Sequence, residues 1–281
     1  MQTPSDNDVR APGALRLALE MRAPWEFGAS LAALPILMSA PRGDGHPVLV
    51  FPGLAASDLS TGPLRGYLKD RNYAPHRWQL GRNFGPRPGV LAGCEQLVHK
   101  LHERYGRKVS LIGWSLGGIY ARETAKQVAD KVRSVITLGT PFAGHPRATN
   151  AWQLYEFVSG EHVDNRRDWD EIKRAPPVPT TSIYSRTDGI VAWQCSVQEA
   201  GPQTENIEVE ASHVGLGVNP AVLYAIADRL AQPEGQWQPF DRSGLRQLVY
   251  RDPAAADCLP NTRLFSLPAA PCRVTPPSWR P

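Results

Sequence analysis

The sequence predicts an α/β fold in which a mostly parallel sheet carries helices on both faces and a short cap is inserted near its middle. Three observations predict this class. Short apolar runs alternate with longer amphipathic stretches, the runs lack a polar face, and turn-forming residues stand at most of the joints. Strands without a polar face are typical of a sheet that is covered on both sides. The 281 residues suffice for one large domain with tails.

Six apolar runs are predicted to be strands. They cover residues 46–51, 74–80, 108–113, 131–139, 180–185 and 206–211. Helical spacing of apolar residues is found over residues 60–72, 89–106, 116–129 and 219–232. Because these helices alternate with the strands, right-handed crossover connections and a parallel sheet are expected.

The chain is expected to divide into three regions. Residues 1–45 should form a loose arm and a packing helix that breaks near Pro24, residues 46–231 the α/β core, and residues 232–281 a Pro-rich, irregular extension. Within the core, residues 142–178 interrupt the alternation but contain two short, aromatic-rich amphipathic stretches. We interpret this excursion as a cap or lid over a site, with a functionless insertion as the alternative.

Composition argues against several classes of protein. The net charge is only +4 and basic residues are interleaved with acidic ones, so no nucleic-acid partner is expected. The longest apolar stretch, residues 27–40, is too short to span a membrane and is interrupted by Pro35, so no integral membrane segment is expected. Acidic residues ahead of that stretch argue against a signal peptide. A cytoplasmic location is therefore expected, while secretion and the oligomeric state stay open.

The four cysteines show neither a C-x-x-C pair nor zinc-type spacing. No metal site and no cofactor are therefore predicted. Cys94 lies in a helical stretch and is expected to be a buried thiol. Cys258 and Cys272 lie in the Pro-rich extension, where a disulfide between them would form only in an oxidising compartment.

The segment GWSLGG follows a predicted strand and precedes a predicted helix. Strand, G-x-S-x-G and helix in this order are typical of a nucleophile elbow, in which a strained turn exposes the serine hydroxyl. Gly113 and Gly117 would let the strand and helix approach closely. Ser115 is therefore the candidate nucleophile, with a simple turn residue as the alternative.

A serine nucleophile needs a base and a group that orients the base. Asp188 follows the predicted strand 180–185, and His213 follows the predicted strand 206–211. The order Ser, Asp, His and the position of each residue at a strand's carboxyl end fit such a triad. A turn-forming Asp188 and a loop histidine are the alternatives for the single residues.

Acyl transfer also needs donors for a developing oxyanion. The backbone N–H of Leu116, directly after the serine, is one candidate. The other is the N–H of Leu54, which follows Pro52-Gly53 at the end of the first core strand. An ordinary turn is the alternative for this second segment.

With these motifs in order, the chain resembles the serine α/β-hydrolase superfamily, of the esterase and lipase kind. The resemblance covers residues 46–231 and includes GWSLGG, LGTPFAG, TDGIV and SHVGLG. It implies cleavage of a small-molecule or lipid-like ester through an acyl-enzyme. Pro52 stands where many members carry histidine, and the cap matches no familiar type. An acyltransferase or thioesterase with the same triad and a non-catalytic binding protein remain alternatives.

Candidate substrate-binding residues are mostly aromatic. An apolar pocket lining is expected from Trp114, Phe142, Trp152 and Tyr155. Asn83, in its glycine-rich loop, is expected to bind polar groups of a substrate. Each of these side chains has a structural alternative, in the core or in support of a loop. Arg122 is expected to anchor the loop around Asn83 through a salt bridge.

Overall fold

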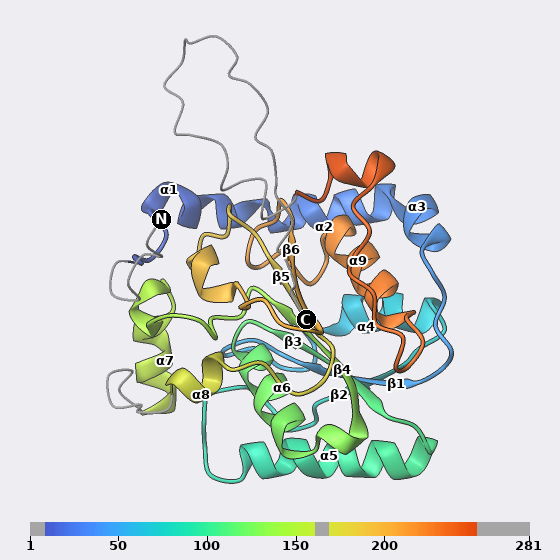
Figure 1. Cartoon of the computed structure of the whole chain (residues 1–281). Coiled ribbons are helices and arrows are strands. Elements are labelled where there is room, and N and C mark those ends of the chain that lie inside the picture. The colour runs from blue at the N-terminus through green and yellow to red at the C-terminus, as the bar shows by residue number, and fades with distance from the viewer. Residues whose placement is uncertain (1–8, 161–168, 252–281) are drawn as a thin grey trace, which may run out of the picture.

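The computed structural model describes residues 9–160 and 169–251. Its centre is a sheet of six parallel strands in the order β2-β1-β3-β4-β5-β6 (Figure 1). The strands are β1 (Pro47–Phe51), β2 (Ala74–Arg77), β3 (Val109–Trp114), β4 (Val132–Leu138), β5 (Thr180–Tyr184) and β6 (Thr204–Glu208). The predicted α/β class and all six predicted strands are confirmed.

Helices cover both faces of this sheet (Figure 1). The helices of the core are α4 (Gly62–Asp70), α5 (Val90–Tyr105), α6 (Leu116–Gln127) and α9 (Pro220–Leu230). The excursion contains η4 (Pro146–Ala148), α7 (Trp152–Ser159) and α8 (Trp169–Lys173), and short 3-10 turns are η3 (Ala129–Lys131), η6 (Trp193–Ser196) and η7 (Gly244–Leu248). The four predicted core helices and both amphipathic stretches of the excursion are thus found as helices.

Side chains alternate across the sheet and build a core on each face. On β1, Val48 and Val50 pack with residues of α4 and α9, whereas Leu49 and Phe51 pack with residues of α5 and α6. All five residues of β1 are buried. This two-residue period with no solvent-facing side is what a strand sandwiched between two helical layers requires.

The edge strand β2 is shorter than predicted. The sequence predicts a strand through residue 80, but β2 ends at Arg77. The backbone N–H groups of Trp78 and Gln79 donate instead to the two carboxylate oxygens of Asp58, at 3.0 and 3.2 Å. The side chain of Asp58, from the loop after β1, therefore takes the place of the next backbone hydrogen bonds between β2 and β1.

The segments on either side of the core pack against it. Ahead of β1 lie α1 (Ala14–Ala18), η2 (Leu19–Arg22), α2 (Ala23–Ala32) and α3 (Leu34–Ser39), with the predicted break just before Pro24. After α9, Phe240 and Tyr250 are buried in the same core as β1. Cys94 is buried on α5, as predicted, whereas Cys258 and Cys272 lie outside the described residues.

Within the described residues, no helix combines the length and the apolar character needed to cross a bilayer.

The turn between β3 and α6 depends on two glycines. A Cβ at Gly113 would lie 2.3 Å from the Cα of Gly118, and a Cβ at Gly117 would lie 2.5 Å from the carbonyl oxygen of Phe51. Both distances are shorter than real Cβ contacts, and the atoms that would be struck are backbone atoms. The predicted close approach of strand and helix is therefore present, and it also brings α6 against β1.

Gly117→Ala should lower the free energy of unfolding by roughly 1–3 kcal/mol, because the backbone of β1 must move to admit the methyl group. Gly66→Ala is the matched control: it also adds a methyl group inside a helix, but a Cβ there meets nothing within 4 Å. The control should be neutral or gain up to ~1 kcal/mol. Denaturant unfolding of both variants measures this, and equal stabilities would contradict the packing argument.

Candidate active site

Ser115 occupies the turn between β3 and α6, at the carboxyl end of the sheet. Its backbone has φ 54° and ψ −125°, a conformation that costs a non-glycine residue of order 1–3 kcal/mol. The Ser115 N–H donates to the carbonyl oxygen of Leu138 at 2.8 Å, and the Ser115 carbonyl accepts from the N–H of Gly118 at 2.9 Å. Strand β4 and helix α6 thus hold the serine in this strained position.

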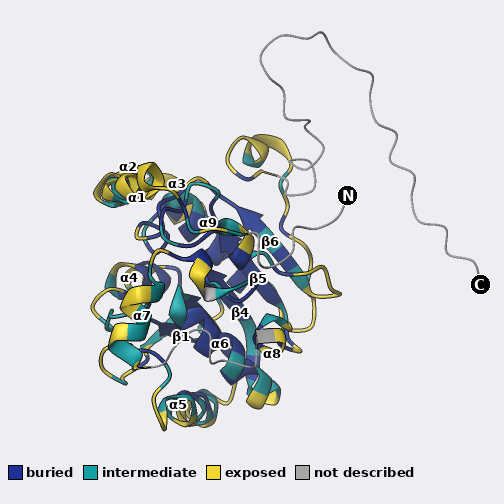
Figure 2. Cartoon of the chain, turned by 90° about the vertical axis from the view of Figure 1, so that its left-hand side faces the viewer, coloured by how far each residue is buried: buried dark blue, intermediate teal, exposed yellow. Residues whose placement is uncertain are grey.

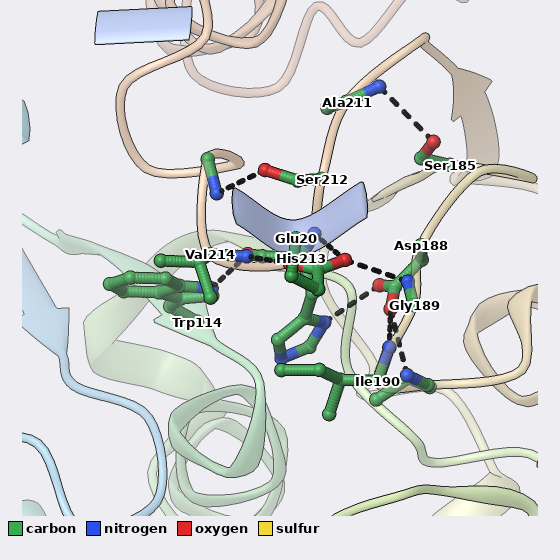
Figure 3. A network of polar contacts seen from close by, with 12 residues as sticks. Glu20, Trp114, Ser185, Asp188, Gly189, Ile190, Ala211, Ser212, His213 and Val214 are labelled. Carbon is green, nitrogen blue, oxygen red and sulfur yellow. Dashed lines mark hydrogen bonds and ion pairs between the residues drawn. The ribbon is translucent and has the colours of Figure 1, made fainter. Parts of the chain in front are cut away.

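Asp188 and His213 form a buried pair beside this turn (Figure 3). Oδ2 of Asp188 lies 2.7 Å from Nδ1 of His213. The other carboxylate oxygen, Oδ1, accepts the N–H groups of Ile190 and Val191 at 2.8 and 2.7 Å. With the carboxylate held in this way, a proton on Nδ1 leaves Nε2 free to accept another.

The surroundings raise the pKa of the His213 imidazole above its ordinary value. Burial alone would lower this pKa, but the charge and hydrogen bond of Asp188, together with the charge of Glu20, outweigh burial. Gly139, at the start of the motif LGTPFAG, lies against the pair, since a Cβ there would sit 3.0 Å from Nδ1 of His213. The space around the imidazole is therefore filled on this side.

A pocket of about 210 Å³ joins the serine and the histidine. Its lining is Gly53, Leu54, Ala56, Trp114, Ser115, Ala151, Leu154, Ile190, His213 and Val214. Among the described residues, no hydrogen bond links Ser115 to His213, so the two side chains share the pocket without a direct bond. Catalytic hydrogen bonds are commonly long before substrate binds.

Asn83 does not line this pocket. Its side chain is buried, donates to the carbonyl oxygen of Pro52 at 2.8 Å and accepts the N–H of Gly85 at 3.2 Å. The backbone carbonyl oxygen of Asn83 accepts the N–H of Ala55 at 2.7 Å. The expectation that Asn83 binds substrate is corrected, because both polar ends of its amide already support the loop that carries Leu54.

The aromatic candidates divide between pocket and core. Trp114 lines the pocket, and its Nε1 donates to the carbonyl oxygen of His213 at 3.0 Å. Phe142 is buried in a separate small cluster, beneath the guanidinium of Arg122 at 3.8 Å. Phe142 is therefore a core residue, contrary to expectation.

Helix α7 reaches the pocket through a different face from the one predicted. Ala151 and Leu154 line the pocket, whereas Trp152 lies against Arg147 and Tyr155 lies near Gly85. Trp152 and Tyr155 thus contact neighbouring loops, whereas Phe157, the third aromatic residue of α7, is exposed.

Arg122 has a different partner from the one predicted. Its guanidinium donates to Oε1 of Gln198 at 2.7 Å and to the carbonyl oxygens of Lys173 and Arg174 at 3.0 and 3.1 Å. These bonds fasten the end of α8 to α6, so the predicted salt bridge to the loop around Asn83 is wrong. Burial lowers the pKa of Arg122 to about 10.

Glu20 is a residue of this site that the motifs did not reveal. Its Oε1 accepts the N–H groups of Gly189 and His213 at 2.7 and 2.9 Å, and its Oε2 accepts that of Val214 at 2.9 Å (Figure 3). One carboxylate from the N-terminal segment thus joins the loop of Asp188 to the loop of His213. The sequence signal was an acidic residue within a mostly apolar helical stretch.

Two neighbours of Glu20 extend this connection. Arg22 donates to the carbonyl oxygen and Oγ1 of Thr187 at 3.1 and 2.8 Å, and Glu26 accepts the N–H of Ser212 at 2.7 Å. Arg22 and Glu26 are themselves paired at 3.1 Å. The N-terminal segment therefore contacts both loops through charged side chains.

In the part of the chain that the structure describes, no three His, Cys, Asp or Glu side chains are grouped closely enough to hold a metal ion.

The parallel sheet, with its polar residues gathered at the carboxyl ends of the strands, defines an α/β hydrolase. The model of the alpha/beta hydrolase family matches residues 45–257, and the chain belongs to that family.

A solved structure shares this fold at low sequence identity. Lipase B of Aspergillus fumigatus is 18% identical, with a TM-score of 0.53 over 70% of this chain and 56% of the lipase. The chain thus spans little more than half of that lipase. An alpha/beta superfamily hydrolase of Oenococcus oeni PSU-1 is 17% identical, with a TM-score of 0.49 over 66% of this chain and 91% of the other. No curated protein matches the sequence.

The raised pKa of His213 can be measured by NMR titration of its imidazole. A group with a raised folded-state pKa stabilises the fold below its unfolded pKa of about 6.5 and loses this contribution as pH rises through the folded pKa. Asp188→Asn should lower the pKa of His213, because it removes the nearest negative charge. Asp70→Asn, at an exposed position on α4, should leave it unchanged, and equal effects of the two substitutions would contradict the assignment.

Proposed function

We propose that the protein hydrolyses carboxylic esters through a serine nucleophile. The observation that carries this proposal is that the strained Ser115 shares one pocket with His213, whose Nδ1 is bonded to Asp188. A strained serine, an imidazole with a free Nε2 and a carboxylate behind it are the three parts of an acyl-transfer triad.

In the proposed acylation, Oγ of Ser115 attacks the ester carbonyl carbon while Nε2 of His213 takes the hydroxyl proton. Asp188 holds the imidazole in the required tautomer and stabilises its charged form. The tetrahedral intermediate then collapses, the bond to the alcohol oxygen breaks, and His213 passes its proton to the leaving alcohol. Water, activated by the same imidazole, releases the acid and restores the serine.

The oxyanion of the intermediate would be bound by the N–H groups of Leu54 and Leu116. Leu54 lines the pocket and Leu116 is the first residue of α6, directly after Ser115. Within the described residues neither N–H has a hydrogen-bond partner, so both are available to a ligand. Each such donor contributes of order 3 kcal/mol to the transition state in comparable hydrolases. Asn83 supports this role by fixing the loop on both sides of Leu54.

The pocket lining supports an apolar acyl group as the substrate portion that is bound. Seven of its ten residues are apolar, namely Leu54, Ala56, Trp114, Ala151, Leu154, Ile190 and Val214. The remaining three are Gly53, Ser115 and His213, so the lining offers no fixed charge to a charged acyl chain. A pocket of about 210 Å³ is small for a ligand site. A series of p-nitrophenyl esters of increasing acyl length would measure this limit.

Ser115→Ala should abolish turnover of p-nitrophenyl esters, with a loss of at least about 10³-fold, because no other group replaces the nucleophile. The matched control is Ser60→Ala, at an exposed serine just ahead of α4, which should keep full activity. A fluorophosphonate should label the native protein once, at Ser115, and should fail to label Ser115→Ala. Undiminished turnover by Ser115→Ala would remove this serine from its proposed role.

Two outcomes would replace the proposal by another one. Faster transfer to added alcohols than to water would indicate an acyltransferase, and preference for thioesters over oxygen esters would indicate a thioesterase. A native protein that neither turns over esters nor reacts with the fluorophosphonate would instead be a binding protein on a hydrolase fold.

A further inference from the structure

The outer side of the helices ahead of β1 is an exposed apolar surface. We name residues 14–39, which comprise α1, η2, α2 and α3, the N-terminal ridge. The sequence predicts a packing helix here, but most of its large apolar side chains are exposed. In Figure 2, α1–α3 are accordingly coloured mainly as exposed. The exposed side chains are Leu15, Leu17, Leu19, Met21, Trp25, Phe27, Leu31, Leu34, Ile36 and Met38. Isolated exposed apolar residues are ordinary, but ten exposed large apolar side chains within residues 14–39 indicate a binding face.

Charge on the ridge has one sign. Its two carboxylates, Glu20 and Glu26, turn inward to the loops of Asp188 and His213. Arg16 is exposed within the ridge, and Arg10 and Arg42 are exposed just outside its two ends. The exposed carboxylate nearest to Arg42 in the chain, Asp44, is paired with Arg107 and Arg133. Asp70 of α4 is exposed beside the ridge, in the groove that Phe27 and Leu31 line. The outward face is therefore apolar with positive charge toward its two ends.

We propose that the N-terminal ridge docks on the surface of a phospholipid bilayer that contains anionic lipids. Apolar side chains including Trp25 and Phe27 enter the boundary between headgroups and acyl chains, and the arginines contact anionic headgroups. The longest helix of the ridge has 10 residues, about half of the ~20 needed to span. The ridge therefore lies along the membrane surface.

The same charges disfavour a second copy of the chain as the occupant. Two copies packed through this face would bring arginine ends against arginine ends in either direction, which costs free energy. An anionic lipid surface instead neutralises them.

The ridge also contacts one rim of the pocket. Glu20 of the ridge binds the N–H of Val214, and the half-exposed side chain of Val214 lines the pocket beside Leu154. Docking of the ridge would thus place one rim of the pocket near the lipid.

Cosedimentation of the full chain with vesicles tests this docking. The native protein should bind vesicles of phosphatidylcholine mixed with phosphatidylglycerol more tightly than phosphatidylcholine alone, and added salt should weaken the binding. Met21 and Trp25 are 82% and 80% exposed, so the double variant Met21→Ser/Trp25→Ser should keep its fold, which thermal unfolding checks. This variant should bind at least about tenfold more weakly, because two large apolar side chains leave the interface.

Leu59→Ser is the matched control, since Leu59 is 85% exposed but lies in the loop ahead of α4. It should bind vesicles like the native protein, and so should Ser115→Ala, which separates docking from the proposed hydrolysis. Absence of binding to the mixed vesicles, or equal binding by the double variant, would overturn the proposal. A native dimer that the double variant converts to a monomer would identify a second copy as the occupant and overturn it as well.

A separate observation concerns Glu20 itself. Its carboxylate accepts three backbone N–H groups, from Gly189 in the loop of Asp188 and from His213 and Val214 in the loop of His213. We infer that Glu20 is a positioning residue, which fixes the imidazole of His213 and the carboxylate of Asp188 relative to each other. This inference rests on the proposed function, because the relative position of the two side chains matters only if they act together.

The charge of Glu20 raises the pKa of His213, and this effect distinguishes Glu20 from a residue that only makes structural contacts. The charged groups that raise the pKa of His213 are Asp188 and Glu20. Glu26 binds the neighbouring N–H of Ser212 from the same segment but does not contribute to this shift. Glu20 and Glu26 thus make similar hydrogen bonds and differ in their electrostatic effect on the imidazole.

Glu20→Gln and Glu26→Gln should therefore differ. Both should lower thermal stability, but Glu20→Gln alone should move the acid limb of the rate profile, and the NMR titration of His213, to lower pH. The sign follows because removal of a negative charge lowers the pKa of the imidazole, which then stays neutral and able to accept a proton in more acidic solution. Ester turnover by Glu20→Gln at neutral pH should fall by roughly tenfold or more, because the two loops are less well held.

Equal titration of His213 in the two variants would overturn the positioning role. Since NMR needs no substrate, it tests the contact even if the native protein turns over no ester. In that case the proposed function would fail while the effect of Glu20 on the imidazole could still be measured.

Discussion

The site depends on how closely the turn after β3 approaches the backbone of β1. Gly117 stands where a methyl group would strike the carbonyl oxygen of Phe51, so α6 begins directly against the neighbouring strand. This contact fixes the strained turn of Ser115 between β1 and β4, and it brings the loop of Leu54 to the same side of the serine. Because the sheet is parallel throughout, the loops of Asp188 and His213 emerge at the same edge. Sheet direction and one close backbone contact therefore account for most of the arrangement.

The sequence predicted the structure well wherever neighbouring residues in the chain determine it. Apolar period, glycines and turn residues predicted the six strands and four core helices found in the described residues, although β2 ends before its predicted limit. The position of Asp188 and His213 after strands placed them at the carboxyl edge of the sheet. It failed where long-range contacts decide. Nothing near Asn83 shows that its amide binds the loop of Pro52, and nothing near Phe142 shows that Arg122 covers it. Glu20 meets its partners across more than 160 residues of chain. Such contacts have no period and no motif, so only the folded chain reveals them.

Two buried histidines each lie beside an aspartate, but their surroundings shift the pKa of the imidazole in opposite directions. His46, at the opposite end of the sheet, also has Nδ1 beside an aspartate, with Oδ1 of Asp44 at 2.6 Å. Burial, aided by the charge of Arg133, lowers the pKa of His46 to about 4, despite the opposing effect of Asp44. His213 instead lies near two carboxylates and no arginine contributes to its shift, so its pKa rises. The same aspartate–imidazole contact thus accompanies a lowered imidazole pKa at one end of the sheet and a raised one at the other.

The inward carboxylates of the N-terminal ridge have a consequence for biosynthesis. The ridge is translated before the rest of the domain, whereas the backbone N–H groups that donate to Glu20 and Glu26 belong to residues 189–214. At about 5–20 residues per second, roughly ten to forty seconds separate the two during elongation. Until then the two carboxylates lack the backbone N–H groups that bind them in the folded chain. The ridge can therefore be fastened to the site only after residues 189–214 have been synthesised.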